Sequence, residues 1–195
     1  MKIIGICGPS CSGKSCVAKL LAQDLNASIL CLDNFIIQGA RKIYVNYKGQ
    51  KIRTFERPEL YDGKRLARCV NELNEKGSVK FTIFNLTRLE EEEVFVKKND
   101  YLILEGFLLF QFTELTSLMD YKFFIDLPFR EVVSRRVKRA DRPKADNSFV
   151  LIGYQENKKF CLPQKDFPGV IILDGKKTIS ELKTDILFHI NQSVS

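Results

Sequence analysis

Short runs of apolar residues alternate along the chain with stretches in which apolar residues recur every three or four positions. The short runs have the composition of buried strands and lie at residues 3–7, 28–32, 101–104, 122–126 and 170–173. Helical spacing is found between and after them, at residues 14–25, 62–77, 130–139 and 182–190. This alternation is typical of parallel strands joined by crossover helices. The sequence therefore predicts an α/β fold in three layers, α/β/α, with a mainly parallel sheet.

Capping and turn residues mark boundaries in the central part of the chain. Asp62 is placed to cap a helix at its start, and Gly77 is placed to end it. Residues 79–86 and 94–96 are expected to be strands, and the acidic run between them, residues 90–93, is interpreted as a solvated turn. We therefore expect a β insertion beside the main sheet.

The chain contains no internal repeat and no low-complexity linker. This predicts a single domain over residues 1–195, with a substrate-side insertion at about residues 34–98. The Arg-Pro-Lys sequence at residues 142–144 interrupts the regular pattern before a helix near residues 149–160. A small lid is accordingly expected at about residues 135–148.

Composition places the chain among ordinary globular proteins, since 45% of its residues are hydrophobic and 28% are charged. The longest apolar run has four residues, whereas a membrane-spanning helix needs about 20, so no membrane partner is expected. The apolar stretch at residues 3–7 is too short for the core of a signal peptide. These features predict a cytoplasmic location.

Cysteine and histidine usage narrows the chemistry. The cysteines form no CxxC pair and lie mostly in apolar stretches, which predicts free thiols rather than disulfides or a zinc site; they are Cys7, Cys11, Cys16, Cys31, Cys69 and Cys161. His189 is the single histidine, and we interpret it as a packing or surface residue. One histidine makes a multi-histidine metal centre or a histidine-based triad hard to support.

The net charge of +7 is concentrated in two segments. Residues 135–144 carry six Lys or Arg against Asp141, and residues 41–57 carry six against Glu56. Each segment therefore has a local charge of +5, and the rest of the chain is −3. Basic patches bind phosphate groups in nucleic acids and in small anionic ligands alike. The charge pattern alone fits a phosphate-handling cleft and a nucleic-acid surface equally well.

A glycine-rich segment directly after the first predicted strand carries the strongest functional signal. Its sequence, GPSCSGKS at residues 8–15, fits the pattern GxxxxGK[ST] and opens the first predicted helix. In such a loop, backbone amides and the helix N-terminus cradle phosphates, the lysine neutralises their charge, and the following hydroxyl reaches Mg²⁺. The predicted ATP-phosphate-binding residues are Gly8, Ser10, Cys11, Ser12, Gly13, Lys14, Ser15 and Cys16.

Two acidic residues follow other predicted strands. Asp33 comes directly after residues 28–32, and Glu105 comes directly after residues 101–104. Ligands of open parallel sheets gather at the carboxyl ends of the strands, so either carboxylate is a candidate to hold Mg²⁺ or to orient a hydroxyl group. Helix capping and plain surface exposure are the alternative interpretations of each residue.

The basic segment at residues 135–144 is interpreted as a lid over the phosphates. Arginine side chains there would offset charge on a phosphoryl group during its transfer. Six cations cannot all reach one triphosphate, so some of them are expected to be surface charges. A wholly solvated basic face is the alternative.

Taken together, these segments resemble the uridine kinase and nicotinamide riboside kinase group of P-loop nucleoside kinases. The similarity covers nearly the whole chain and is carried by IIGICGPSCSGKS, ILCLDNF, FERPELYD, YLILEGFLLF, REVVSRRVKR and FCLPQKDFPGVII. It implies a P-loop kinase fold with a small lid. It also implies ATP-dependent, Mg²⁺-assisted phosphorylation of the ribose 5′-hydroxyl of a small-molecule nucleoside, with no nucleic-acid partner.

The resemblance implies roles for individual residues as well. Asp33 would face the ribose 5′-hydroxyl as base or positioner, with Ser15, Glu105 and Asp33 around Mg²⁺. An ordinary aspartate, with a pKa of about 3.9, is a weak base for an alcohol, so Asp33 is expected to position the hydroxyl and accept its proton late. The implied catalytic residues are Asp33, Lys14, Arg136 and Arg139, and the implied substrate-binding residues are Asp33, Glu56, Phe84, Arg136 and Arg142.

Departures from the family pattern affect substrate choice. Glu56 stands where uridine kinases usually have aspartate, Ile36 replaces a tyrosine, and Phe84-Asn85-Leu86 occupies a base-reading segment without its histidine. A missing hydrogen-bond partner can cost orders of magnitude in discrimination, so the nucleobase is left open. We rank uridine or cytidine kinase activity first and nicotinamide riboside kinase activity second. The alternatives from other classes are a nucleic-acid-binding P-loop ATPase and an inactive kinase-like regulator.

Overall fold

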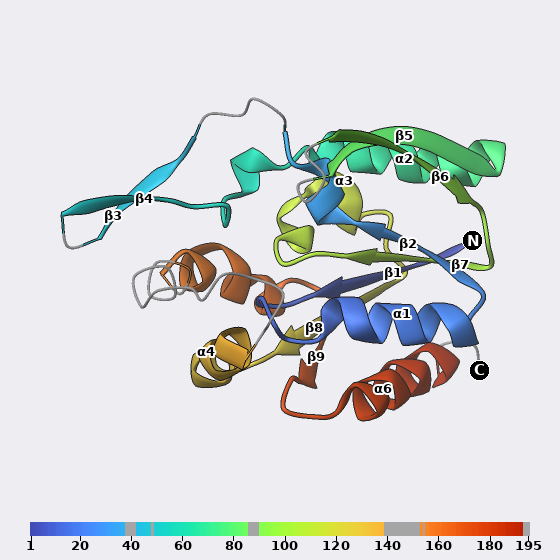
Figure 1. The fold of residues 1–195 in the computed structure, drawn as a ribbon. Coiled ribbons are helices and arrows are strands. Elements are labelled where there is room, and N and C mark those ends of the chain that lie inside the picture. The colour runs from blue at the N-terminus through green and yellow to red at the C-terminus, as the bar shows by residue number, and fades with distance from the viewer. Residues whose placement is uncertain (38–41, 48, 86–89, 139–152, 154, 193–195) are drawn as a thin grey trace.

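The computed structural model describes residues 1–37, 42–47, 49–85, 90–138, 153 and 155–192. Its centre is a five-stranded sheet in the order β2-β7-β1-β8-β9, in which every neighbouring pair runs parallel (Figure 1). The strands are β1 (Lys2–Cys7), β2 (Ala27–Cys31), β7 (Tyr101–Glu105), β8 (Tyr121–Asp126) and β9 (Val170–Asp174). The predicted parallel sheet and its strands are confirmed.

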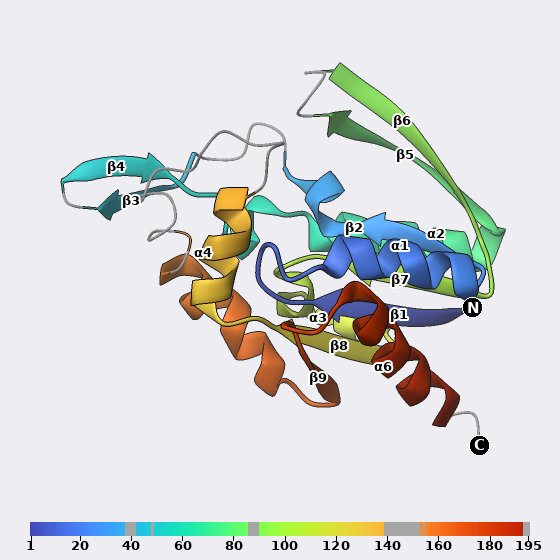
Figure 2. The same cartoon turned by 60° about the horizontal axis from the view of Figure 1, so that its bottom comes forward.

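Helices cover both faces of this sheet. α1 (Lys14–Asp24) and α6 (Ile179–Gln192) lie on one face, and α2 (Gly63–Lys76) lies with α3 (Thr113–Thr116) on the other (Figures 1 and 2). One hydrophobic cluster fills the space on each side of the sheet. The result is the three-layer α/β/α arrangement that the sequence predicts.

The central strand β1 shows how the sheet positions the functional loop. Its side chains alternate between the two cores: Ile3 and Cys7 pack on the α2 side, and Ile4 and Ile6 pack on the α1 side. All four are buried. A strand buried on both faces must be apolar along its length, so the polar glycine-rich loop begins only where the strand ends, at the carboxyl edge of the sheet.

The ends of α2 follow the capping signals in the sequence. Asp62 Oδ1 accepts a hydrogen bond of 2.8 Å from the Arg65 amide at the start of the helix. Gly77 ends the helix in the left-handed conformation, with φ 77°. Both predicted boundaries are confirmed.

Two antiparallel hairpins extend from the main sheet. One pairs β3 (Tyr44–Tyr47) with β4 (Gln50–Arg53), and the other pairs β5 (Ser78–Asn85) with β6 (Glu90–Lys97). The interpretation of residues 90–93 as a turn is wrong, because these glutamates are the first residues of β6 and pair with β5. An edge strand needs only one apolar face, so the glutamates of β6 can stay largely in solvent.

The chain after β8 contributes helical segments at the carboxyl edge of the sheet. α4 (Phe129–Lys138) agrees with the helix predicted at residues 130–139, and η4 (Asn157–Cys161) leads into η5 (Leu162–Asp166). Most of the predicted lid, from residue 139 onward, lies outside the described residues. Among the described residues, short helices also occur at η1 (Leu32–Phe35), η2 (Pro58–Leu60) and η3 (Leu109–Gln111).

The cysteines are free thiols, as predicted. His189 on α6 packs beside Phe123 and Phe188, with ring centroids 6.1 and 5.7 Å away, which agrees with its interpretation as a packing residue. In the part of the chain that the structure describes, no helix has both the length and the apolar character to cross a membrane.

Candidate functional site

The glycine-rich loop at residues 8–15 joins the end of β1 to the start of α1. Gly8 has φ 142° and Gly13 has φ 98°, and both conformations favour glycine. A Cβ atom on Gly8 would lie 2.5 Å from the Ile125 carbonyl oxygen, and one on Gly13 would lie 2.7 Å from Ile179 Cδ1. Backbone contact with β8 therefore requires glycine at position 8, and the left-handed φ favours glycine at position 13.

Two polar side chains of this loop, Lys14 and Ser12, are buried. Lys14 Nζ donates to the Pro9 carbonyl at 2.8 Å, and the residue is only 8% exposed. Ser12 Oγ is buried, and it has no hydrogen-bond partner among the residues that the structure describes. A buried hydroxyl without a partner is unfavourable, and a phosphate oxygen would satisfy it. The loop thus fits a polyphosphate such as that of ATP.

Ser15 and Glu105, which the family resemblance assigns to Mg²⁺, lie in contact with each other. Ser15 Oγ donates to Glu105 Oε1 at 3.0 Å. Glu105 ends β7, the strand between β1 and β2, and is 6% exposed. Mg²⁺ prefers oxygen ligands and is held by one or two carboxylates together with phosphate and water. Over the described ranges, no group of three or more His, Cys, Asp or Glu could hold a metal.

Asp33 lies on η1, directly after β2, and is exposed. Burial is the largest cause that raises the pKa of Tyr61, Cys31 and Glu56, and the negative charge of Asp33 adds to it in all three cases. Glu105 also raises the pKa of Cys31. The carboxylates of Asp33, Glu56 and Glu105 are therefore close enough together for their charges to act on shared neighbours.

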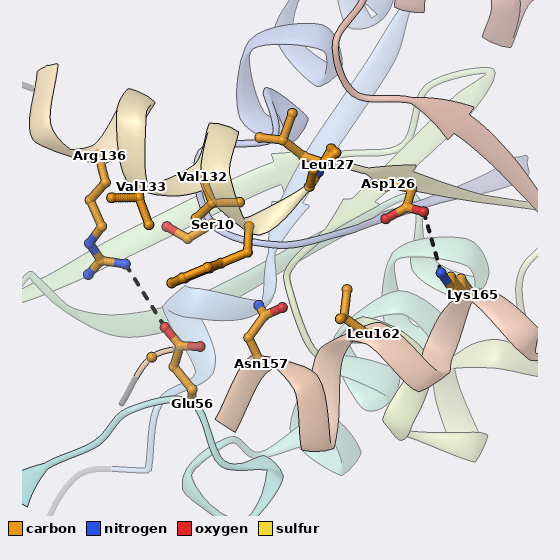
Figure 3. A pocket seen from close by; sticks show the side chains of 13 residues that line it. Ser10, Glu56, Asp126, Leu127, Val132, Val133, Arg136, Asn157, Leu162 and Lys165 are labelled. Carbon is orange, nitrogen blue, oxygen red and sulfur yellow. Dashed lines mark hydrogen bonds and ion pairs between the residues drawn. The ribbon is translucent and has the colours of Figure 1, made fainter. Parts of the chain in front are cut away.

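Glu56 and Arg136 face each other at one end of a pocket (Figure 3). Arg136 Nη1, on α4, lies 4.0 Å from Glu56 Oε1, and the two side chains are 18% and 16% exposed. Burial raises the pKa of Glu56 to about 7, although the positive charges of Arg136 and Lys14 oppose this change. The structure thus brings together Lys14, Glu56 and Arg136, which come from distant parts of the sequence.

The pocket lies between α4 and η4, beside Ser10 of the phosphate loop (Figure 3). Val132, Val133 and other apolar residues line it, and Asp126 and Lys165 form an ion pair of 3.4 Å at its other end. Its volume is ≈ 120 Å³, below the roughly 300–1,000 Å³ of most small-molecule sites. The pocket is too small for a whole nucleoside, so it forms only a part of the candidate site.

Arg135 makes contacts that the sequence does not predict. Its Nη1 donates to the Cys11 carbonyl at 3.3 Å, and its Nη2 donates to the Gly175 carbonyl at 2.8 Å. These bonds join α4 to the phosphate loop and to the turn after β9. A row of basic residues carries no signal for which side chain turns inward, so the sequence could not identify this one.

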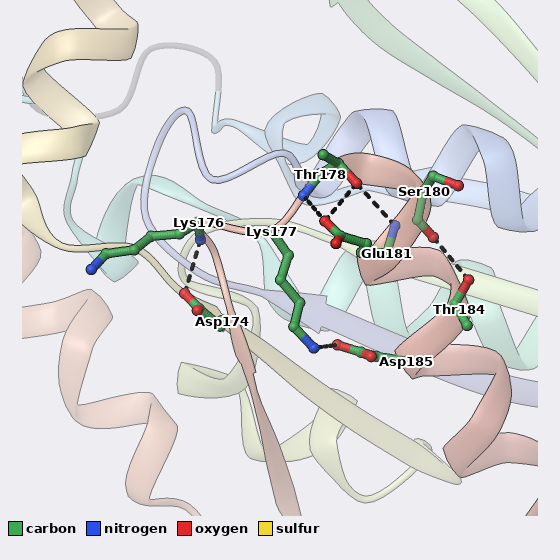
Figure 4. A network of polar contacts seen from close by, with 8 residues as sticks. All are labelled: Asp174, Lys176, Lys177, Thr178, Ser180, Glu181, Thr184 and Asp185. Atoms are coloured by element: carbon green, nitrogen blue, oxygen red, sulfur yellow. Dashed lines mark hydrogen bonds and ion pairs between the residues drawn. The ribbon is translucent and has the colours of Figure 1, made fainter.

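The turn after β9 is held by its own polar network (Figure 4). The Thr178 amide and hydroxyl donate to Glu181 Oε2 at 2.8 and 2.7 Å, and the Glu181 amide donates back to Thr178 Oγ1 at 3.3 Å. The two bonds from Thr178 lower the pKa of Glu181. Lys177 Nζ donates to Asp185 Oδ2 at 2.7 Å. This capping of α6 steadies the segment that Arg135 contacts.

The remaining predicted site residues are only partly placed. Ser10 and Cys11 are half-buried, with Oγ and Sγ 3.8 Å apart, and Cys16 is exposed on α1. Arg139 and Arg142 lie outside the described residues, and so does the side chain of Phe84. The substrate contacts expected of these last three residues stay predictions.

Known proteins share the sequence pattern of this chain. The sequence model of the phosphoribulokinase / uridine kinase family matches residues 3–146. A uridine kinase of Shewanella amazonensis is 30% identical, over 95% of this chain and 92% of that protein. The uridine-cytidine kinase A of Dictyostelium discoideum is 28% identical, over 91% of this chain and 37% of that protein.

Solved structures share the fold. A sugar kinase from Janibacter sp. HTCC2649 has a TM-score of 0.61 at 15% identity, over 98% of this chain and 95% of that one. The shikimate kinase of Aquifex aeolicus has a TM-score of 0.52 at 18% identity, over 100% of this chain and 98% of that one. At such identities the likeness concerns the fold alone, and it agrees with the predicted P-loop kinase architecture.

Proposed function

The chain belongs to the phosphoribulokinase / uridine kinase family, and from that premise we propose that it transfers the terminal phosphoryl group of ATP to the ribose 5′-hydroxyl of uridine or cytidine. The protein is a kinase, a phosphotransferase with an alcohol group as acceptor. Its partner in the reaction is accordingly a small-molecule nucleoside.

The observation that carries the proposal is the meeting of Ser15 and Glu105 behind the phosphate loop. Their 3.0 Å hydrogen bond places a hydroxyl and a carboxylate together, beside the buried Lys14. Mg²⁺, when bound, would supply positive charge that neutralises part of the charge on the phosphates of ATP. Ser15 and Glu105 would hold the ion, and Lys14 would exchange its bond to the Pro9 carbonyl for bonds to phosphate.

Asp33 is proposed to orient the attacking hydroxyl. It is exposed at the carboxyl end of β2, which neighbours the strand that ends in Glu105. In a loose phosphoryl-transfer transition state, the acceptor hydroxyl needs orientation more than early deprotonation. Asp33 would therefore hold the hydroxyl in line with the phosphoryl group and accept its proton late.

Glu56 and Arg136 are proposed to hold the substrate from another side. The carboxylate of Glu56 offers acceptors for ribose hydroxyls, and the guanidinium of Arg136 offers donors and positive charge for phosphoryl oxygens. Their separation of 4.0 Å is longer than a hydrogen bond. A ligand can therefore form hydrogen bonds with either side chain without first breaking a strong bond between Glu56 and Arg136.

A panel of nucleosides tests the proposed function. The protein would be incubated with ATP and Mg²⁺ and, separately, with uridine, cytidine, nicotinamide riboside and other ribonucleosides, and the products would be separated by chromatography. A 5′-monophosphate formed together with ADP is the expected result. ATP hydrolysis that is stimulated by an oligonucleotide, without phosphorylation of any nucleoside, would contradict the proposal.

The substitution Asp33→Asn tests the role of the proposed positioning carboxylate. We expect kcat for uridine to fall at least about 10²-fold, because an amide cannot accept the hydroxyl proton. ATP affinity, measured by calorimetry, should stay within about twofold of the wild-type value. Asp24→Asn, at the exposed end of α1, is the matched control and should not change turnover. Near-normal turnover of the Asp33 variant would remove this residue from its proposed role.

We propose that the reaction takes place in the cytoplasm. ATP is available there, and free thiols persist in its reducing environment. All six cysteines of this chain are free thiols, and Cys16 is exposed.

A further inference from the structure

Arg57, the residue after Glu56, contacts several side chains that no sequence motif identifies. Its Nε and Nη2 donate to the two carboxylate oxygens of Glu156, the second bond at 3.2 Å. Its guanidinium lies 5.1 Å from the centroid of the Phe160 ring, and Nη1 lies 3.7 Å from Glu59 Oε1. The side chains of Arg57 and Glu156 are 23% and 7% exposed, so the two residues form a largely buried ion pair.

The pair joins two segments that are 99 residues apart in the sequence. Arg57 leads into η2, and Glu156 directly precedes η4. Arg57 has φ −123° and ψ 130°, an extended conformation in which consecutive side chains point to opposite sides. Both side chains nevertheless reach the segment around Glu156: Arg57 binds Glu156 itself, and Glu56 lines the pocket with Arg136 and with Asn157, the next residue after Glu156 (Figure 3).

Local hydrogen bonds shape the same segment. The Glu56 amide donates to Thr54 Oγ1 at 3.1 Å, and Tyr61 Oη donates to the Phe55 carbonyl at 3.0 Å. Both bonds join residues that are close in the sequence, so they do not tie the segment to η4. The Arg57 ion pair does, and it thereby sets the position of the Glu56 backbone relative to the wall formed by η4.

Stability alone does not explain such a pair. The desolvation of two charges largely offsets their attraction, so a buried ion pair stabilises a protein little more than well-packed apolar residues do. A bidentate arginine–carboxylate pair is strict in its geometry, however, because two parallel hydrogen bonds fix both distance and angle. The main consequence of the Arg57–Glu156 pair is therefore positional.

We propose that Arg57 and Glu156 are positioning residues that hold the Glu56 carboxylate where it binds the ribose hydroxyls of the nucleoside. The inference rests on the proposed function, because it concerns the same nucleoside site. Glutamate has one more rotatable bond than the aspartate usual at this position, so its carboxylate can reach more places. Anchoring Arg57, the adjacent residue, limits the positions that the carboxylate can reach. The carboxylate can then distinguish a nucleoside that has a 2′-hydroxyl from one that lacks it.

The substitution Arg57→Met removes the hydrogen bonds while keeping a long side chain. The measured quantities are kcat and KM for uridine, 2′-deoxyuridine and ATP. We expect KM for uridine to rise at least about tenfold and the preference for uridine over 2′-deoxyuridine in kcat/KM to fall by a similar factor. KM for ATP should change less than about twofold, since the phosphate loop is untouched.

The double variant Arg57→Met/Glu156→Met separates positioning from stability. It leaves no unpaired buried charge, so its melting temperature should return close to that of the wild type. Its preference for uridine over 2′-deoxyuridine should nevertheless stay low. Arg57→Lys keeps the charge but loses the bidentate geometry, and it should be intermediate. This variant keeps the test decisive if Arg57→Met does not fold.

Lys183→Met is the matched control, because it breaks the Lys183–Asp24 ion pair of 2.6 Å between α6 and α1, away from the pocket. It should leave all three KM values unchanged.

The inference would be overturned if the double variant recovered both its melting temperature and its preference for uridine. It would also be overturned if Arg57→Met and Arg57→Lys kept the preference of the wild type. If the wild-type protein phosphorylates no ribonucleoside, the proposed function fails and this inference fails with it. If only the variants behave otherwise than expected, this inference fails alone.

Discussion

The carboxylate of Glu56 occupies a setting that disfavours its charge. Burial raises its pKa from the ordinary 4.5 to about 7, against the opposing effects of Arg136 and Lys14. Between these two pH values the folded protein holds a proton that the unfolded chain releases. Stability therefore falls as the pH rises through this range, by up to about 3 kcal/mol in the free energy of unfolding.

The substitution Glu56→Gln removes this titration. Glutamine is neutral at every pH, so the variant should gain stability relative to the wild type between about pH 5 and about pH 8, by roughly 1–3 kcal/mol. Urea denaturation at the two pH values measures the gain. Glu72→Gln is the control, since Glu72 forms an exposed ion pair with Lys76 on α2 and should show no comparable gain. Equal relative stability of the Glu56 variant at both pH values would contradict the raised pKa.

Individual site residues could be located from the sequence where they follow a predicted strand. The strand ends make Asp33 and Glu105 candidates for the edge where the phosphate loop begins, and the family resemblance adds Ser15 to the same expected Mg²⁺ site. The structure brings the side chains of Ser15 and Glu105 within hydrogen-bonding distance, and their role toward Mg²⁺ stays a prediction. Arg57, Glu156 and Arg135 could not be found in this way. The direction of a charged side chain depends on the packing of segments that are far apart in the sequence.

Among the elements, the phosphate loop depends most directly on its glycines. Gly13→Ala would place a Cβ atom 2.7 Å from Ile179 Cδ1 and impose φ 98° on a residue with a side chain. The end of the Ile179 side chain can move aside, but the strain at φ 98° remains, and its relief shifts the loop backbone and the amides that face the phosphates. ATP affinity should fall at least about tenfold, as measured by calorimetry with a non-hydrolysable ATP analogue and Mg²⁺.

Gly77→Ala is the control for this prediction. Gly77 has a comparable φ of 77°, but it ends α2, and nothing lies within 4 Å of an added Cβ atom. The substitution should lower the free energy of unfolding by about 1 kcal/mol and leave ATP affinity unchanged. An equal loss of ATP affinity in both variants would show that general destabilisation, and not loop geometry, is the cause.

Buried elements were predicted more successfully than exposed ones. The strands of the main sheet are apolar on both faces, so their sequences stand out from the flanking segments. The sequence does not predict the hairpin of β3 and β4. This hairpin differs from a loop in its strand pairing, and among its described residues it has no buried apolar face that a sequence pattern would reveal. The same reason explains the error at residues 90–93, where four glutamates have the composition of a turn but form part of an edge strand.

Over the whole molecule, elements of the two basic segments lie toward one end. α4 and the β3–β4 hairpin lie at the same end of the molecule, where β1 leads into the loop (Figures 1 and 2). Both belong to the two segments in which the net positive charge is concentrated. Clustered positive charge raises the local concentration of an anionic substrate such as ATP. We therefore expect positive charge at this end to favour the binding of ATP.

A single buried amide connects distant parts of the same end. Gln164, on η5, is fully buried. Its Oε1 accepts from the Phe110 amide at 2.8 Å and from the Cys7 thiol at 3.5 Å, and its Nε2 donates to the carbonyls of Phe107 and Cys161 at 2.9 and 3.1 Å. These bonds tie the end of β1 to the chain after β7 and to the junction of η4 and η5.

The substitution Gln164→Leu should lower the free energy of unfolding by about 2–4 kcal/mol, because it leaves buried backbone groups of Phe107 and Phe110 without these partners. Urea denaturation measures the change. Gln192→Leu, at the exposed end of α6, replaces the same side chain and should change stability by less than about 0.5 kcal/mol. A loss in the Gln164 variant no larger than in this control would mean that the backbone groups find other partners, and that the three segments are held together by apolar packing alone.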